Sequence, residues 1–202
     1  MIIIENLCKA YNDKILFKNF HLEIPDSSFF VISGESGCGK STLLNMIGGI
    51  ETPDKGSIIV NGFDVAKKGK KQKYFKEVVG FLFQNFALLE NKTVKENLEI
   101  IKKSGRTDIS INEALEKVGL QKVINKKVYQ LSGGEQQRVA LARLMLKKCS
   151  IVLADEPTGS LDKKNSEIVM NILHELSEQG KTVIVVTHSE EIVAQEKHVL
   201  YL

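Results

Sequence analysis

The sequence lacks long apolar runs, a strong charge of either sign and clustered cysteines. No apolar segment approaches the ~20 residues that a membrane-spanning helix needs, so we expect no such helix. The net charge of +3 is too small to indicate a nucleic-acid partner. Cys8, Cys38 and Cys149 lie far apart and match no metal-ligand spacing, which is typical of reduced thiols. Residues 1–12 lack the basic region and cleavage site of a signal peptide, so we expect a cytosolic protein.

Apolar strands alternate with helices along the 202 residues, which predicts one α/β domain with a mainly parallel sheet covered on both faces. The strands predicted for this sheet are 29–32, 78–83, 150–156, 182–187 and 198–202. Alternating and hairpin patterns predict a small antiparallel sheet from 1–5, 20–24, 57–60 and 63–65. Helices are predicted to start at 43 and to span 94–103, 109–118, 132–148, 162–179 and 189–196. The section from about 86 to 148 is therefore expected to be mainly helical.

A glycine-rich loop, GESGCGKST, separates the strand at 29–32 from the helix that follows. The pattern G-x-x-x-x-G-K-[ST] in this context predicts a phosphate-binding loop, because its N–H groups and the helix N-terminus attract anions. Lys40 can reach the terminal phosphates of a nucleotide, and the hydroxyl of Ser41 can bind Mg²⁺. The residues predicted to hold the nucleotide here are Gly34, Glu35, Ser36, Gly37, Cys38, Gly39, Lys40, Ser41 and Thr42.

Polar side chains follow three predicted strands at the edge of the sheet where ligands bind in parallel folds. Asp155 ends an apolar strand and is expected to hold Mg²⁺, and Glu156 could accept a proton from an attacking water. Gln84 could contact Mg²⁺ or that water, and His188 could bond the terminal phosphate. A single histidine at a strand end is more often structural, and a single glutamine indicates little. The prediction rests on the fact that all of these polar residues lie at the ends of strands in a chain that also carries the phosphate loop.

A second glycine-containing segment, LSGGEQQR, opens the predicted helix at 132–148. Ser132, Gly133 and Gly134 would form a second anion-binding helix N-terminus. The simpler alternative is an ordinary N-cap with a flexible entry. Since one nucleotide does not need two phosphate cradles in one chain, we expect the second cradle to serve the nucleotide of another subunit.

With these motifs in order, the whole chain resembles the ATP-binding subunits of ABC transporters. GESGCGKS matches the Walker A loop, Gln84 the Q-loop, LSGGE the signature, IVLADE Walker B, SLD at 160–162 the D-loop and His188 the switch histidine. Tyr11 lies where this family places an aromatic ring that stacks on adenine. Glu135 departs from the more common glutamine. The resemblance implies a P-loop NTPase fold, a head-to-tail homodimer with two ATP molecules at its interface, Mg²⁺, and a membrane permease as partner.

Assignment of the chain to a branch of this family rests on longer stretches of sequence. ADEPTGSLD and FQNFALLENKTVKENL resemble the branch of lipoprotein-releasing, macrolide-efflux and cell-division ATPases. The second run and the lysine-rich stretch at 67–76 most resemble ATPases assigned to bacteriocin export. This implies an ATPase of an export complex at the cytoplasmic face of the membrane. The alternative is an ATPase that drives a mechanical or signalling membrane complex. Six lysines between 67 and 76 are expected to form a solvated surface, or alternatively to contact anionic lipids.

Overall fold

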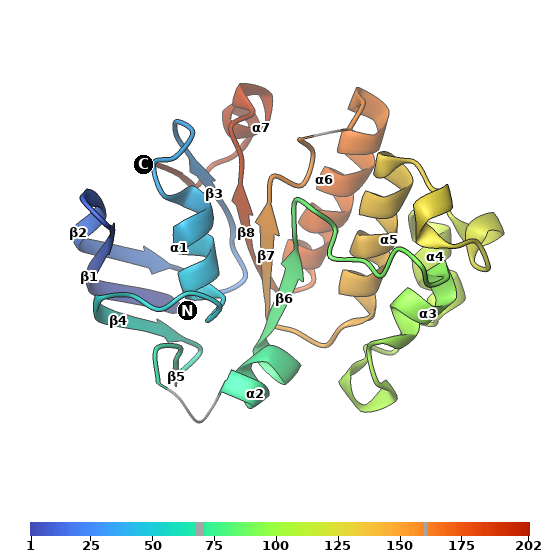
Figure 1. The fold of residues 1–202 in the computed structure, drawn as a ribbon, viewed down its shortest axis with the longest axis horizontal. Helices are drawn as coiled ribbons and strands as arrows, with labels where there is room; N and C mark the ends of the chain where they lie inside the picture. Colours follow the sequence, from blue (N-terminus) through green and yellow to red (C-terminus); the bar gives the residue numbers. More distant parts are fainter. Residues whose placement is uncertain (68–70, 160) are drawn as a thin grey trace.

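Two β-sheets lie on either side of the first helix in the computed structural model, which describes residues 1–67, 71–159 and 161–202 (Figure 1). The antiparallel sheet has the order β2-β1-β4-β5 and contains β1 (Ile2–Tyr11), β2 (Lys14–Ile24), β4 (Lys55–Val60) and β5 (Phe63–Asp64). The parallel sheet has the order β6-β7-β8-β3-β9 and contains β3 (Phe29–Ser33), β6 (Val79–Leu82), β7 (Ile151–Asp155), β8 (Thr182–Val186) and β9 (Val199–Tyr201). The predicted α/β class with two separate sheets is confirmed.

Helices cover both faces of the parallel sheet. Helix α1 (Lys40–Ile47) lies between the two sheets, and α5 (Gly133–Leu146) and α6 (Lys163–Glu178) cover the opposite face (Figure 1). The shorter helices are α2 (Lys71–Lys73), α3 (Val94–Glu99), α4 (Ile111–Lys117) and α7 (Glu190–Gln195). A π-helical turn spans Tyr74–Val78, and 3₁₀ turns span Lys103–Gly105, Gln121–Val123 and Val128–Gln130. None of the helices in the described ranges is long and apolar enough to cross a membrane.

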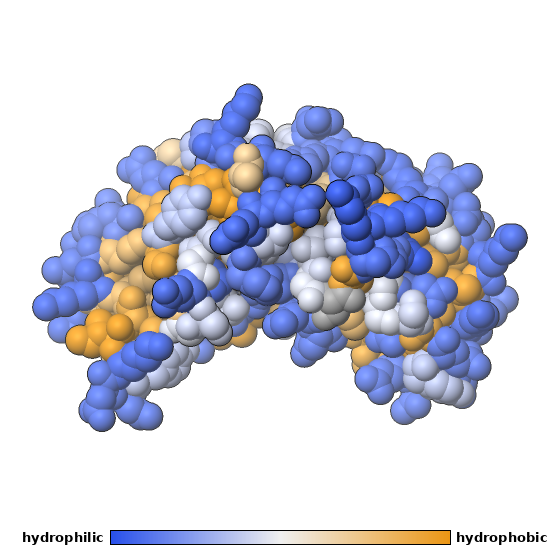
Figure 2. Space-filling view, turned by 90° about the horizontal axis from the view of Figure 1, so that it is seen from above, coloured by the Kyte–Doolittle hydropathy of each residue, from blue (hydrophilic) through white to orange (hydrophobic). Residues whose placement is uncertain are grey.

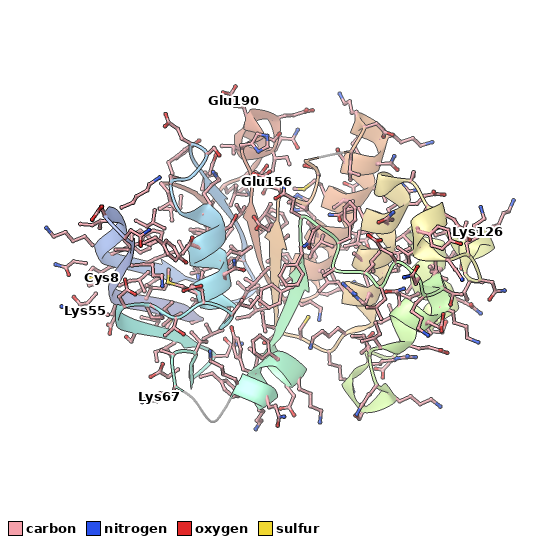
Figure 3. All side chains as sticks on the ribbon, viewed as in Figure 1. Cys8, Lys55, Lys67, Lys126, Glu156 and Glu190 are labelled. Carbon is pink, nitrogen blue, oxygen red and sulfur yellow. The ribbon has the colours of Figure 1, made fainter. Side chains whose placement is uncertain are left out.

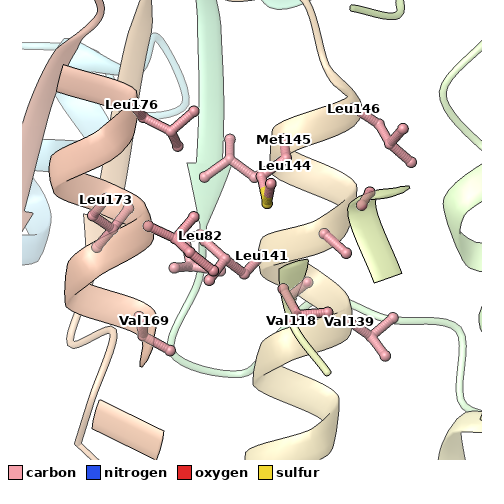
Figure 4. Packing of buried hydrophobic residues seen from close by; sticks show 14 of the residues in the cluster. Leu82, Val118, Val139, Leu141, Leu144, Met145, Leu146, Val169, Leu173 and Leu176 are labelled. Carbon is pink, nitrogen blue, oxygen red and sulfur yellow. The ribbon is translucent and has the colours of Figure 1, made fainter. Parts of the chain in front are cut away.

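The parallel sheet divides the buried apolar side chains into two cores. Because successive side chains of a strand point to opposite faces, Val152 and Ala154 of β7 join the core beneath α5 and α6, whereas Ile151 and Leu153 join the core around α1. Figure 4 shows the first of these cores, in which leucines of α5 and α6 lie together with Leu82 of β6. The central side chains of both cores are fully buried. Their packing fixes the carboxyl ends of the strands relative to one another.

Several predicted boundaries were wrong by a few residues. The strand at 1–5 continues to Tyr11 and its partner starts at Lys14, because alternate side chains of this long ribbon remain buried. The helix predicted to end at 103 ends at Glu99, since Lys102 is extended and opens a 3₁₀ turn. In the lysine-rich stretch, Lys71–Lys73 are helical and Lys67 and Lys71 are held by contacts to Asp64 and Gly49. Lys68, Gly69 and Lys70 lie outside the described residues, as does Ser160 of the SLD motif.

Candidate functional site

The glycine-rich loop turns sharply between β3 and α1. Gly34, Gly37 and Gly39 have φ values of 147°, 78° and 110°, a backbone region that side chains disfavour. A Cβ atom on Gly34 would also lie 2.5 Å from the carbonyl oxygen of Leu202, and one on Gly39 would lie 3.0 Å from the ring of Phe17. The fold therefore requires glycine at these positions, and the loop can bring its N–H groups close to an anion.

Lys40 is folded back into the loop that it follows. Its side chain is buried, and its Nζ donates hydrogen bonds to the carbonyl oxygens of Gly34 and Glu35, both at 2.8 Å. A second lysine, Lys14 from the start of β2, donates to the carbonyl oxygen of Gly37 at 2.8 Å. Lys14 was not predicted from the sequence, because nothing in the local pattern places this strand residue against the loop. Two ammonium groups thus lie at the phosphate cradle.

Ser41 and Asp155 form the hard-oxygen pair of the site. The hydroxyl of Ser41 donates to Oδ1 of Asp155 at 2.9 Å. Burial raises the pKa of the Asp155 carboxyl, and the Ser41 hydrogen bond and the charge of Lys40 act against this rise. A hydroxyl and a carboxylate suit Mg²⁺, which is usually held by one or two protein oxygens with water and phosphate completing the shell. The described residues contain no cluster of three or more His, Cys, Asp or Glu that could hold a metal alone.

Glu156 lies at the end of β7, on the upper edge of the sheet in Figure 3. Its backbone has φ 45°, and its N–H donates to the carbonyl oxygen of Val186 at 2.9 Å, which ties it to β8. Its Oε1 lies 2.8 Å from Nδ1 of His188, and its Oε2 accepts from the hydroxyl of Thr187 at 3.3 Å. A strained backbone at such a position is common at functional sites.

These groups line one pocket of about 480 Å³. Its walls come from Tyr11, Lys14, Leu16, Ser36, Gly37, Gly39, Lys40, Ser41, Thr42, Gln84, Glu156 and His188. The pocket therefore brings together residues from β1, the glycine loop and three strand ends. Gly34, Glu35, Cys38 and Asp155 do not line it, although Gly34, Glu35 and Asp155 contact lysine or serine residues that do. Figure 2 looks onto this edge of the sheet, and hydrophilic side chains cover most of that face.

Tyr11 presents a half-exposed ring to this pocket. Lys9 lies 4.8 Å from the ring centroid, and its Nζ is 2.7 Å from Oε1 of Glu51. The Glu51 hydrogen bond raises the pKa of Lys9, so the ammonium beside the ring stays charged. Lys9 is almost fully buried, which is uncommon for lysine, and no pattern in the sequence signalled this support of the aromatic ring.

Ser132, Gly133 and Gly134 lie apart from the pocket. Ser132 is the N-cap of α5, and a capping box joins it to Glu135, whose Oε2 accepts from the N–H of Ser132 at 2.8 Å. Such a box favours glutamate or glutamine at this position, which explains why Glu135 can replace the more common glutamine. Among the described residues, none of the three predicted cradle residues lines the wall of the pocket, and no hydrogen bond joins them to the phosphate loop.

Comparisons with known proteins agree with this architecture. A family model described as ABC transporter matches residues 17–159. The macrolide export ATP-binding/permease protein MacB of Campylobacter jejuni is 37% identical over 99% of this chain, which spans 32% of MacB. The cell division ATP-binding protein FtsE of Mycobacterium tuberculosis is 39% identical over 96% of this chain and 87% of its own length.

Two solved structures share the fold. The dimeric structure of MJ0796, described as a bacterial ABC transporter cassette, has a TM-score of 0.90, is 36% identical, and covers 100% of this chain and 94% of its own. The dimeric post-hydrolysis state of MJ0796 bound to ADP and Pi has a TM-score of 0.87, is 35% identical and has the same coverage. The chain therefore belongs to the ABC transporter family as an ATP-hydrolysing ATP-binding domain, and it fits the macrolide-efflux-like branch.

Proposed function

We propose that residues 1–202 form a single ATP-binding domain that powers a membrane export complex through ATP-driven dimerisation. One observation carries this proposal: groups for nucleotide binding and water activation line the pocket, and Asp155 bonds to its Ser41, but the second cradle at Ser132 does not line it. Because that cradle lies apart from the pocket on the same chain, a second copy must supply it. The dimeric structures of MJ0796 support this arrangement.

The residues of the pocket divide the chemistry among them. Tyr11 stacks on the adenine ring, while the loop N–H groups, Lys40 and Thr42 bind the phosphates. Glu156 accepts a proton from the attacking water. The imidazole of His188 lies 2.8 Å from the Glu156 carboxylate and can orient that carboxylate before the imidazole turns to the terminal phosphate. Ser41, Gln84 and Asp155 would hold Mg²⁺, which supplies charge neutralisation at the transferred phosphate.

The membrane partner is an integral permease, and the domain works at the cytoplasmic face of the membrane. Support comes from MacB, in which a segment similar to this chain is about one third of an ATP-binding/permease protein. The transported cargo is a bacteriocin or another peptide, a proposal that rests on the resemblance of the lysine-rich stretch and the FQNFALLENKTVKENL run. No role for nucleic acid is proposed, since the net charge is only +3.

The second candidate is an ATPase that drives a mechanical or signalling membrane complex. The 39% identity to FtsE, which is named for cell division, favours it. Purification of the chain from membranes, followed by identification of the bound permease, separates the two candidates. A permease whose loss stops export of a peptide supports the first, and a permease whose loss leaves all export intact supports the second. Purification without any membrane protein would contradict both.

A further inference from the structure

The segment that carries Gln84 is a tight turn after β6. The N–H of Phe86 donates to the carbonyl oxygen of Phe83 at 3.0 Å, and the N–H of Ala87 donates to that of Asn85 at 2.7 Å. Gln84 is therefore inside a turn closed on its far side by Phe86. The position of its amide in the nucleotide pocket depends on the conformation of that turn.

Phe86 and Ala87 adopt an unusual backbone conformation to close the turn. Their φ values are 61° and 47°, in the left-handed region that residues other than glycine rarely occupy. Two consecutive residues of this kind persist only when their surroundings hold them in place. The side chain of Phe86 packs against the helical core, but Ala87 is exposed and gains no such support.

Arg143 of α5 supplies the missing support. Its Nη1 donates to the carbonyl oxygen of Ala87 at 2.6 Å, and its Nη2 donates to that of Phe86 at 2.9 Å. The rigid planar fork of a guanidinium suits two neighbouring acceptors. Within the described ranges no carboxylate lies within ion-pair distance of Arg143. Burial lowers the pKa of this arginine. The free-energy cost of removing the guanidinium from water is offset by its hydrogen bonds to the two carbonyl oxygens of the turn.

Arg143 and the second cradle are parts of one rigid element. Ser132 caps the start of α5 and Arg143 lies near its end, which at 1.5 Å per residue is a distance of roughly 16 Å. The leucines and valines of α5 are buried in the helical core (Figure 4). A movement of α5 therefore displaces the Gln84 turn through Arg143.

We propose that Arg143 is a positioning residue that holds the Gln84 turn in its left-handed form and ties it to α5. The amide of Gln84 at one nucleotide then moves together with the cradle that Ser132 offers to the other nucleotide of the dimer. This inference rests on the shared site of the proposed function. It adds a specific physical link between the two sites, made of two hydrogen bonds to strained backbone.

A rescue experiment tests whether Arg143 acts by holding the turn in its left-handed form. Arg143→Met keeps most of the side-chain volume but removes both donors, and we expect kcat for ATP hydrolysis to fall by about tenfold to a hundredfold, as for a small misplacement of a reacting group. The affinity of the subunit for ATP should change less than about threefold, because the phosphate loop is untouched. Ala87→Gly in the same chain should restore kcat to within about threefold of the parent, because glycine adopts the left-handed conformation without cost.

The matched control is Asn19→Gly, at an exposed left-handed residue of β2 with φ 51°. This change adds the same backbone freedom far from the turn and should not rescue Arg143→Met. Wild-type kcat in Arg143→Met would overturn the proposal. So would loss of kcat that follows loss of folded protein in thermal melts and is not restored by Ala87→Gly. Gln84→Ala tests the proposed function separately, since unchanged turnover in that variant would remove Gln84 from the mechanism whatever Arg143 does.

Discussion

The imidazole Nδ1 of His188 lies 2.8 Å from the carboxylate Oε1 of Glu156. Glu156 is nearly enclosed, with 13% of its side chain exposed, whereas 72% of His188 is exposed. The carboxylate is therefore fixed between β7 and β8, and the histidine is the partner that is free to turn. This arrangement suits Glu156 as a fixed general base, with His188 beside it as a side chain that can turn toward the terminal phosphate.

Glu156→Gln should keep ATP binding and abolish hydrolysis, because the amide keeps the shape of the side chain but cannot accept the proton. With hydrolysis blocked, ATP and Mg²⁺ should produce a long-lived dimer in gel filtration, and the retained nucleotide should be ATP. Glu190→Gln, at an exposed carboxylate of α7, is the matched control and should turn over normally. A monomer under all conditions, or turnover near that of the parent, would contradict the role of Glu156.

Asp155→Asn should stabilise the protein in the absence of nucleotide and Mg²⁺. Burial raises the pKa of Asp155 above its usual 3.8 in the folded state. A carboxyl whose pKa is higher in the folded than in the unfolded state opposes folding at pH values above both of these pKa values. The effect vanishes at pH values below the pKa of the unfolded state. At pH 8 we expect a rise in Tm of about 1–3 °C, which shrinks as the pH falls through the pKa of the folded state.

The same thermal melts with ATP and Mg²⁺ should reverse the order of the two proteins, because only the parent keeps the carboxylate that binds the cation. Asp108→Asn changes an exposed carboxylate and should leave Tm unchanged at every pH. A variant that is less stable than the parent at pH 8 without ligands would show that the Ser41 hydrogen bond outweighs the cost of burial.

Cys38 should be alkylated faster than Cys8 or Cys149, and ATP should protect it. The Sγ of Cys38 is partly buried in the phosphate loop, 3.9 Å from Nζ of Lys40. Cys149 is buried, and burial raises the pKa of its thiol, so less of the reactive thiolate is present. Peptide mass spectrometry after timed alkylation measures all three thiols, and Cys8 serves as the partly buried control. Equal labelling of Cys38 with and without ATP would contradict its place in the nucleotide site.

Lys40→Ala and Ser132→Arg should complement each other when mixed. Each variant alone damages both shared sites of its homodimer. In the mixed dimer both lesions fall in one site, and the other site retains Lys40 and Ser132. Mixing should therefore restore part of the ATP-driven dimerisation, measured by light scattering. If both variants are folded and no mixture dimerises, each chain uses its own cradle and the shared site is wrong. Dimerisation, not hydrolysis, is the decisive measurement, because turnover can require two intact sites.

The sequence predicted the parts of the site that depend on local pattern. The glycine spacing of the phosphate loop and the apolar runs ending in Asp155 and His188 are contiguous signals; the loop and His188 line one pocket, and Asp155 bonds to Ser41 of that pocket. Lys9, Lys14 and Arg143 were missed for a common reason. Each acts on a carboxylate or backbone carbonyl brought near by the tertiary fold; the acceptors of Arg143 are 56 and 57 residues away in the chain. The environment of the LSGGE segment was predicted only by elimination, and its N-cap geometry explains Glu135.

The apolar residues that follow Gln84 lie in two different environments. Phe86 and Leu88 pack against the helical core, whereas 53% of Leu89 is exposed. Periodicity could not separate these neighbours, because the left-handed turn at Phe86 and Ala87 interrupts any regular alternation. Phe86 therefore belongs to the structural interior, and Leu89 is the residue of this run that remains available to a partner.

Neighbouring residues of one central strand face different interiors, as Val152 and Leu153 do. The parallel sheet consequently separates the core around α1 and the phosphate loop from the core beneath α5 and α6. A substitution among the buried side chains of the helical core therefore changes the packing on one face of the sheet only. The packing around the phosphate loop can thus stay constant while the helical core varies, and the two hydrogen bonds from Arg143 to the turn after β6 belong to the side of the helical core.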